Sequence, residues 1–95
     1  MGRFRIPETL IKQFPIIAAD ILADKIVIKA EMSFATQALE FEAFDPNFDS
    51  VEPGVELPYY DLQYEYQPLN TKKLQELAGY EYIPQNWALI RRDRP

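Results

Sequence analysis

Carboxylates are the side chains in this 95-residue sequence with the most potential for chemistry. The sequence contains 15 Asp and Glu residues but no His and no Cys. It therefore lacks the commonest general base, the commonest metal ligand and any thiolate for zinc or for nucleophilic attack. Catalysis by carboxylates alone needs two of them across a cleft with separated pKa values, and a short chain leaves little room for such a cleft. We predict a protein that is not an enzyme and uses no cofactor or small-molecule substrate.

Charge is segregated along the chain, although the net charge is only −5. Residues 30–71 contain no Lys or Arg but carry nine acids: Glu31, Glu40, Glu42, Asp45, Asp49, Glu52, Glu56, Asp61 and Glu65. All ten basic residues lie outside this stretch, and five of them lie near the chain ends: Arg3, Arg5, Arg91, Arg92 and Arg94. An acidic surface of this kind is either a solvated outer face or a contact surface that attracts Lys and Arg.

One acidic segment bears on metal binding. Asp45, Asn47, Asp49 and Glu56 match positions 1, 3, 5 and 12 of an EF-hand calcium loop. The segment departs from that pattern because Ser50 stands where the sharp turn needs Gly, and because the flanking segments are strand-like rather than helical. We interpret it as an ordinary Asx-rich turn and predict no metal site.

The first half of the chain predicts a helical region followed by two strands. Apolar residues recur at helical spacing across Ile6–Asp24, but Pro15 would clash with the preceding turn. We therefore expect two short helices, or one kinked helix, with the break near Phe14. Hydrophobicity then alternates with a period of two in Lys25–Phe34 and in Gln37–Phe44, as in strands. The first strand should place these residues on one face: Ile26, Ile28, Ala30, Met32 and Phe34.

The join between these two strands contains no Gly, Asn or Pro, so a tight hairpin is unsupported there. One long bent strand, or two strands with a bulge, would also fit the pattern.

The second half predicts a third strand, a short helix and a final strand region, after a loop rich in Pro and Asp. Tyr59–Tyr66 alternates again, and the following residues should face the core: Tyr60, Leu62, Tyr64 and Tyr66. Asn70 as N-cap and Gly79 as C-terminal glycine delimit a short helix. Strand character returns in Tyr80–Ile83 and Trp87–Arg91, which a Pro-Gln-Asn sequence separates.

These elements predict a single α+β domain over residues 1–95. We expect a small antiparallel sheet of about four strands, with the N-terminal kinked or split helix and the short second helix on one face.

The alternation also predicts a contact surface on the outer face of the sheet. It combines acids and one ring from two strands: Glu40, Glu42, Tyr59, Asp61 and Glu65. If those strands pair, their like charges cluster, and such a patch suits a basic protein surface. Tyr80 and Trp87 would extend it if the last strand pairs nearby.

Other partners are disfavoured by the composition. Acidic strands would repel the phosphates of a nucleic acid. No apolar run approaches the length of a membrane helix, and the N-terminus has no apolar core of a signal peptide. We expect a non-secreted protein of the cytoplasm or of a virion.

Two functional hypotheses follow. The first is a non-catalytic structural subunit of a larger, homomeric assembly, such as a phage particle, whose basic ends dock on acidic sheet surfaces of neighbours. The alternative is an acidic inhibitor that mimics nucleic acid and binds the basic groove of a nucleic-acid-binding protein.

Overall fold

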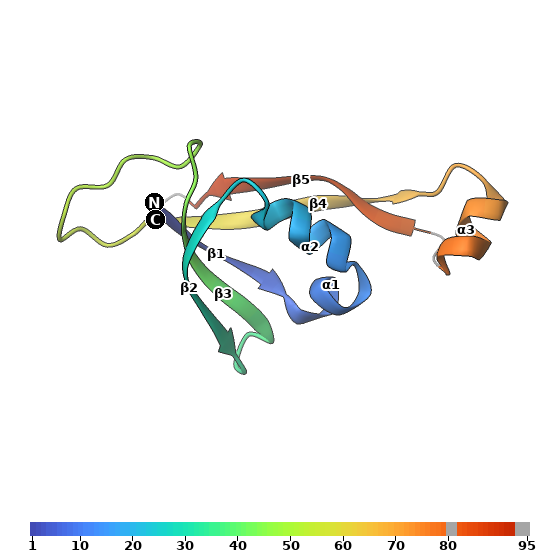
Figure 1. Cartoon of the computed structure of the whole chain (residues 1–95), viewed down its shortest axis with the longest axis horizontal. Coiled ribbons are helices and arrows are strands. Elements are labelled where there is room, and N and C mark those ends of the chain that lie inside the picture. The colour runs from blue at the N-terminus through green and yellow to red at the C-terminus, as the bar shows by residue number, and fades with distance from the viewer. Residues whose placement is uncertain (80–81, 93–95) are drawn as a thin grey trace.

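The computed structural model describes residues 1–79 and 82–92, and it confirms the α+β class (Figure 1). Its elements are β1 (Gly2–Pro7), α1 (Glu8–Gln13), α2 (Pro15–Leu22), β2 (Ile26–Ser33), β3 (Ala38–Phe44), β4 (Tyr59–Pro68), α3 (Lys72–Ala78) and β5 (Tyr82–Arg91). The described strands form one sheet in the order β2-β3-β1-β4-β5. Neighbouring strands run antiparallel, except β1 and β4, which run parallel. The sheet is thus mixed and five-stranded, rather than antiparallel and four-stranded as predicted.

The additional strand is β1, which occupies the centre of the sheet. Gly2, Phe4 and Ile6 are buried in it, whereas Arg3 and Arg5 are only partly covered. This is the period of two expected for a strand with one covered face. The sequence analysis assigned Ile6 to the first helix and treated the two arginines as part of a basic end, so it overlooked the strand.

The split in the N-terminal helical region is confirmed. Phe14 separates α1 from α2 with φ −133° and ψ 63°, and Pro15 occupies the first turn of α2, where its missing N–H costs nothing. Both helices cover the same face of the sheet (Figure 1). The short helix α3 does not cover that face, contrary to the prediction, because it lies at the far end of β4 and β5 (Figure 1).

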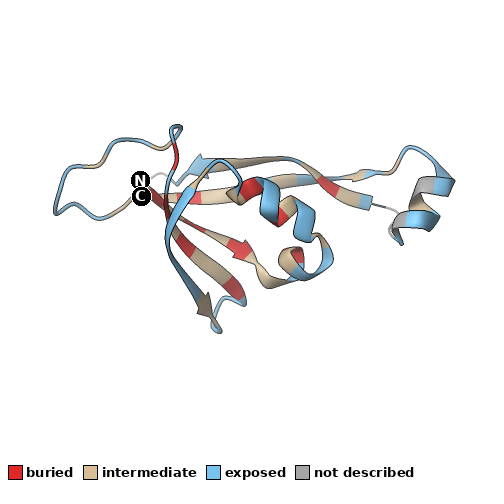
Figure 2. Ribbon diagram, viewed as in Figure 1, coloured by how far each residue is buried: buried red, intermediate tan, exposed pale blue. Residues whose placement is uncertain are grey.

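The core lies between α1, α2 and the central strands (Figure 2). Its buried members are Phe4, Ile6, Leu10, Ala18, Ile21, Phe41, Ala43 and Tyr60. The Phe4 and Phe41 rings stack at 5.2 Å between centroids, and Phe48 stacks on Tyr60 at 4.1 Å. None of the helices in the two described ranges is long and apolar enough to cross a membrane.

β2 and β3 form a hairpin, which settles the alternative that the sequence left open. Gln37 adopts a positive φ of 51° in the turn, and the Thr36 N–H donates to Ser33 Oγ at 3.4 Å. The predicted apolar face of β2 is wrong in part. Ile26 and Ile28 are exposed because β2 is an edge strand and because a bulge between Val27 and Lys29 shifts the alternation.

β4 and β5 extend beyond the rest of the sheet as a two-stranded arm. β4 pairs with β1 only at Tyr59 and Tyr60, whereas its pairing with β5 continues to Pro68. The molecule therefore measures 52 × 27 × 26 Å. Tyr66, which was expected in the core, is 57% exposed on this arm.

The ends of α3 are close to those predicted. Gly79 has a φ of 76° directly after the helix, as expected for a C-terminal glycine. The helix begins at Lys72, so Thr71 rather than Asn70 precedes it. β5 is continuous through the Pro-Gln-Asn sequence, with Asn86 at a φ of 55°; the predicted strand start at Tyr80 lies outside the described residues.

Candidate contact site

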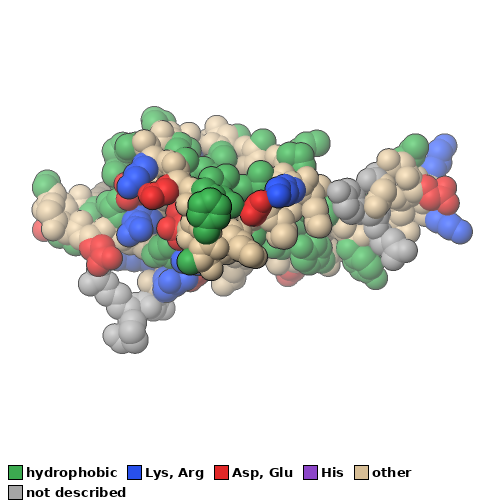
Figure 3. All heavy atoms as spheres, turned by 90° about the horizontal axis from the view of Figure 1, so that it is seen from below, with side chains coloured by type: hydrophobic (Ala, Val, Ile, Leu, Met, Phe, Trp, Pro, Cys, Tyr) green, Lys and Arg blue, Asp and Glu red, His purple; other side chains and the backbone are tan. Residues whose placement is uncertain are grey.

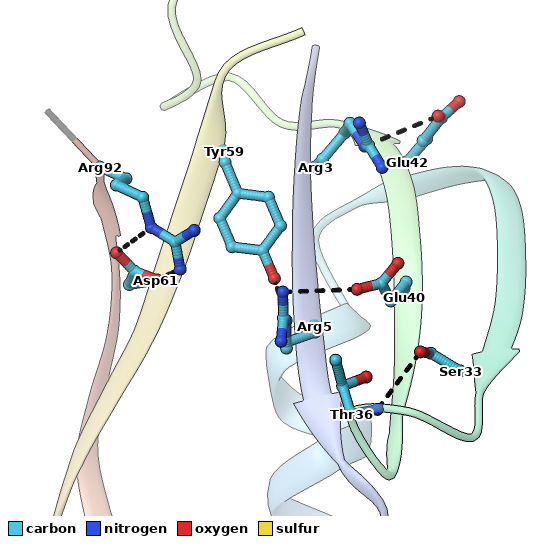
Figure 4. A network of polar contacts seen from close by, with 9 residues as sticks. All are labelled: Arg3, Arg5, Ser33, Thr36, Glu40, Glu42, Tyr59, Asp61 and Arg92. Atoms are coloured by element: carbon cyan, nitrogen blue, oxygen red, sulfur yellow. Dashed lines mark hydrogen bonds and ion pairs between the residues drawn. The ribbon is translucent and has the colours of Figure 1, made fainter. Parts of the chain in front are cut away.

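The outer face of the sheet carries a row of charged side chains that we call the charged ladder (Figure 4). Its members are Arg3, Arg5, Glu40, Glu42, Tyr59, Asp61 and Arg92. They come from β3, β1, β4 and the end of β5, and they point away from α1 and α2 because Phe4, Phe41 and Tyr60 point toward the core.

Strand β1 places a positive column between two negative ones. Arg3 lies opposite Glu42 and Arg5 lies opposite Glu40 in the register of β1 and β3. The shortest N–O distances are 3.8 Å for the first pair and 3.5 Å for the second. Opposite charges across a ladder stabilise a sheet, so the sequence of Glu and Arg on these strands supports this register.

Tyr59 joins the two halves of the ladder. Its hydroxyl accepts a hydrogen bond from Arg5 Nε, and its ring lies between two guanidinium groups. The centroid is 5.3 Å from Cζ of Arg5 and 4.4 Å from Cζ of Arg92, which is within cation–π range. The predicted orientation of Tyr59 toward the acids is therefore confirmed, but the ring contacts arginines.

Arg92 and Asp61 form the outermost pair. Arg92 Nε donates to Asp61 Oδ2 at 3.1 Å, and a second guanidinium nitrogen donates to Oδ1, so the contact is bidentate. The hydrogen bond from Arg92 lowers the pKa of Asp61 below its ordinary value. This pair ties the end of β5 to β4.

The expected cluster of like charges does not form, because β3 and β4 are not neighbours. β1 lies between them and supplies Arg3 and Arg5. Two glutamates are nevertheless directly opposite each other, Glu31 on β2 and Glu40 on β3. Since Glu40 pairs with Arg5, Glu31 is left with the exposed Lys29 at 3.5 Å as its ion-pair partner among the described residues.

The remaining predicted contact residues lie elsewhere. Glu65 is on the arm, where it accepts a hydrogen bond from Gln67 at 3.2 Å. Arg91 lies opposite Tyr60 and forms an ion pair with Asp49 of the long loop, which is the segment 45–58 between β3 and β4. Arg94 and Tyr80 lie outside the described residues. The structure thus brings together seven of the predicted side chains and separates Glu65 and Arg91 from them.

The sequence analysis overlooked a buried ion pair behind the sheet. Lys25 Nζ lies 2.9 Å from Asp45 Oδ2 and donates to the Ile21 carbonyl at 2.7 Å. Three rings surround the ammonium group, with Trp87 nearest at 5.2 Å from its centroid, then Phe4 at 5.9 Å and Phe48 at 6.0 Å. Burial raises the pKa of Asp45, but hydrogen bonds from the Asn47 N–H and from Lys25 outweigh it, so the pKa lies below the ordinary value.

Trp87 belongs to this group of rings around the Lys25 ammonium, which we call the Lys25 cage. It does not lie on the outer face, which corrects the prediction. Its indole N–H donates to Asp20 Oδ2 on α2 at 2.6 Å, and its ring packs against the core. Asn86 has a positive φ of 55°, which alters the direction of the side chains that follow it in the strand.

Two carboxylates of the calcium-like segment, those of Asp45 and Asp49, are engaged with cations of the same chain. Asp45 contacts Lys25 and accepts the Asn47 N–H at 2.8 Å, and Asp49 contacts Arg91. Among the residues that the structure describes, no three His, Cys, Asp or Glu side chains are grouped to hold a metal ion. Asp45 and Asp49 thus act as anchors for the loop.

An open hollow of about 660 Å³ lies under the long loop. Its lining includes Tyr59, Arg91 and Arg92 together with Glu52 and Glu56. Both arginines are already bound to Asp49 and Asp61. The hollow therefore offers mixed charge at its rim rather than a pair of carboxylates facing across a cleft.

Compared with models of protein families, with curated proteins and with solved structures, the chain matches none.

Proposed function

We propose that this chain is a non-catalytic structural subunit of a homomeric assembly, and that the two-stranded arm is its main contact element. The observation that carries the proposal is the arm itself. Beyond Leu62, β4 pairs with no described strand except β5. An isolated two-stranded ribbon is only marginally stable in water, so contact with a neighbouring subunit would stabilise it.

The side chains of the arm support the same proposal. Tyr66 and Tyr82 of the arm are 57% and 54% exposed, and Leu77 of α3, at the end of the arm, is 76% exposed. In the space-filling view, the arm is a narrow projection that carries hydrophobic and charged side chains together (Figure 3). Exposed aromatic side chains anchor protein interfaces, and a projecting element can reach a neighbour without distorting the body of either subunit.

The charged ladder supports a contact through the arm rather than through the basic ends. Arg3, Arg5, Arg91 and Arg92 each have an acidic partner in their own chain. Docking on a neighbour would require these contacts to be exchanged, whereas the arm can bind without breaking them. We propose that the assembly lies in the cytoplasm or in a virion such as a phage particle, since the chain contains no cysteine.

The alternative, an acidic inhibitor of a nucleic-acid-binding protein, has less support. Glu40, Glu42 and Asp61 would have to exchange an arginine of this chain for a basic residue of the target. Exchange of one close pair for another gains little, because the desolvation cost is similar on both sides.

The proposal is tested by light scattering on the full chain over a range of concentrations. We expect a mass that rises with concentration, and a shift toward the monomer in the variant Tyr66→Ser, Leu77→Ser, Tyr82→Ser. Retained circular dichroism shows that the variant is folded, and Ile16→Ser, an exposed apolar residue on α2, is the matched control. A mass that is the same for wild type and arm variant at every concentration would contradict the proposal.

A further inference from the structure

The two edges of the sheet differ in how they are protected. β5 contains Pro84, which has no N–H to offer, and Asn86 with a positive φ, and both interrupt pairing with another strand. β2 contains neither Pro nor Gly, and its residues from Ile26 to Glu31 are all exposed. Apart from the bulge between Val27 and Lys29, β2 is an uncovered edge strand, and such a strand is a template for pairing with another chain.

The charges on β2 fit a second copy of the same strand. Lys29 and Glu31 lie on the outer face, where they face Glu42 and Glu40 of β3. Their side chains are 60% and 69% exposed. Glu31 therefore lies opposite a like charge within its own sheet and has an open position on its other side. A cation placed there would relieve the repulsion from Glu40.

We infer that β2 pairs antiparallel with β2 of a second copy across a two-fold axis at Ala30. In this register Lys29 lies opposite Glu31 of the second copy and Glu31 lies opposite its Lys29, so both charges are matched twice. A shift of the axis to Glu31 would place two glutamates opposite each other. The charges thus favour one register over the others. Lys residues that only protect an edge strand would not favour any register.

The same register covers apolar surface. Ile28 of one copy lies near Met32 of the other at each end of the short ladder. Ile26, Ile28 and Phe34 are 69%, 53% and 86% exposed in the single chain, and hydrophobic side chains are visible between charged ones at the end of the β2–β3 hairpin (Figure 3). The bulge between Val27 and Lys29, present in both copies, limits the regular ladder to Lys29–Glu31 of each copy. This pairing would join the two five-stranded sheets into one continuous sheet, with the arm of each copy at an outer end.

This inference deepens the proposed self-assembly but uses a different surface, so the two can fail separately. Lys29→Glu leaves only glutamates at these positions, and Glu31→Lys leaves only lysines. We expect each variant to weaken the dimer at least about tenfold in analytical ultracentrifugation, because like charges then face each other twice. An equimolar mixture of the two variants should form a heterodimer, and the double variant Lys29→Glu, Glu31→Lys should dimerise within about threefold of wild type.

Lys12→Glu on α1 is the control, because it makes the same change in net charge on the opposite side of the sheet. Amide hydrogen exchange in Lys29–Ser33 should also slow as the wild-type concentration rises. A wild-type monomer, single variants that dimerise like wild type, or a mixture that stays monomeric would each overturn the inference. The Tyr66, Leu77 and Tyr82 variant should keep the β2 dimer, and the Lys29 and Glu31 variants should keep the arm contact, so the two proposals can fail separately.

Discussion

Lys25 and Asp45 form an ion pair of 2.9 Å in which the two side chains are only 1% and 4% exposed. Lys25 follows α2 and Asp45 follows β3, so the pair fastens the start of the long loop to the helical layer. Loss of one partner of a buried pair costs about 3–5 kcal/mol, because the remaining charge is left uncompensated. We expect Asp45→Ala to lower the free energy of unfolding by about that amount in a urea titration.

The control for this prediction is the exposed pair between Lys12 and Glu8, with 2.6 Å between nitrogen and oxygen. Lys12→Ala should change the free energy of unfolding by less than about 0.5 kcal/mol. The double variant Lys25→Met, Asp45→Leu should lose less stability than the sum of the losses from the two single substitutions, since no buried charge remains. Strictly additive effects of the two substitutions would contradict the coupling.

Acid should destabilise the protein through Asp45 and Asp61. Both have pKa values lowered below the ordinary 3.8, Asp61 by the Arg92 hydrogen bond and Asp45 by bonds that outweigh its burial. A carboxyl group with a depressed folded pKa stabilises the fold fully above its unfolded pKa, and this stability is lost as pH falls through the folded pKa. The urea midpoint should therefore fall steeply below pH 4 or so, and Asp45→Asn should flatten this dependence. An identical pH profile in the variant would show that Asp45 does not contribute.

Gly2 is held by close packing at the start of β1. A Cβ atom there would lie 2.6 Å from Cε2 of Tyr60, whose ring is stacked on Phe48 and whose hydroxyl accepts the Asp49 N–H at 2.9 Å. The ring cannot retreat without losing these contacts, so Gly2→Ala should cost about 1–3 kcal/mol in thermal unfolding. Combining it with Tyr60→Ala should cost less than the sum of the two. A neutral Gly2→Ala would contradict this account of the packing.

Arg5 is the most connected residue of the charged ladder, with contacts to Glu40 and Tyr59. Arg5→Gln removes an ion pair and a cation–π contact at the surface, each of which contributes about 0.5–1 kcal/mol. We expect a loss of about 1–2 kcal/mol that shrinks at high salt, measured by denaturant unfolding at two ionic strengths. A loss that does not depend on salt would indicate packing rather than charge.

The helical split and the hairpin strands could be predicted because their signals are local. Pro15 disrupts a helix wherever the chain goes, and alternating apolar residues define β3 almost to the residue. The place of β1 could not be predicted in the same way. The alternation of Phe4 and Ile6 with two arginines fits an exposed chain end equally well. Only the pairing of β1 with β3 and β4 makes this strand central.

The candidate site was predicted by residue but not by arrangement. Alternation identified the outward direction of Glu40, Glu42 and Asp61 correctly, because a strand has a fixed period. Strand order decides which charges meet, and it depends on long-range pairing that no spacing encodes. The cage around Lys25 was missed for the same reason, since its rings come from β1, the long loop and β5.

The central claim is that the arm formed by β4 and β5 is covered in an assembly. Its most direct test is amide hydrogen exchange in residues 63–67 and 82–88 of the wild-type chain at low and high protein concentration. An uncovered ribbon should exchange rapidly, and mass action should slow that exchange at least about tenfold at high concentration. Core amides of β1 and β3 serve as the internal reference. Arm amides that exchange at the same rate at both concentrations, whether fast or slow, would contradict the account.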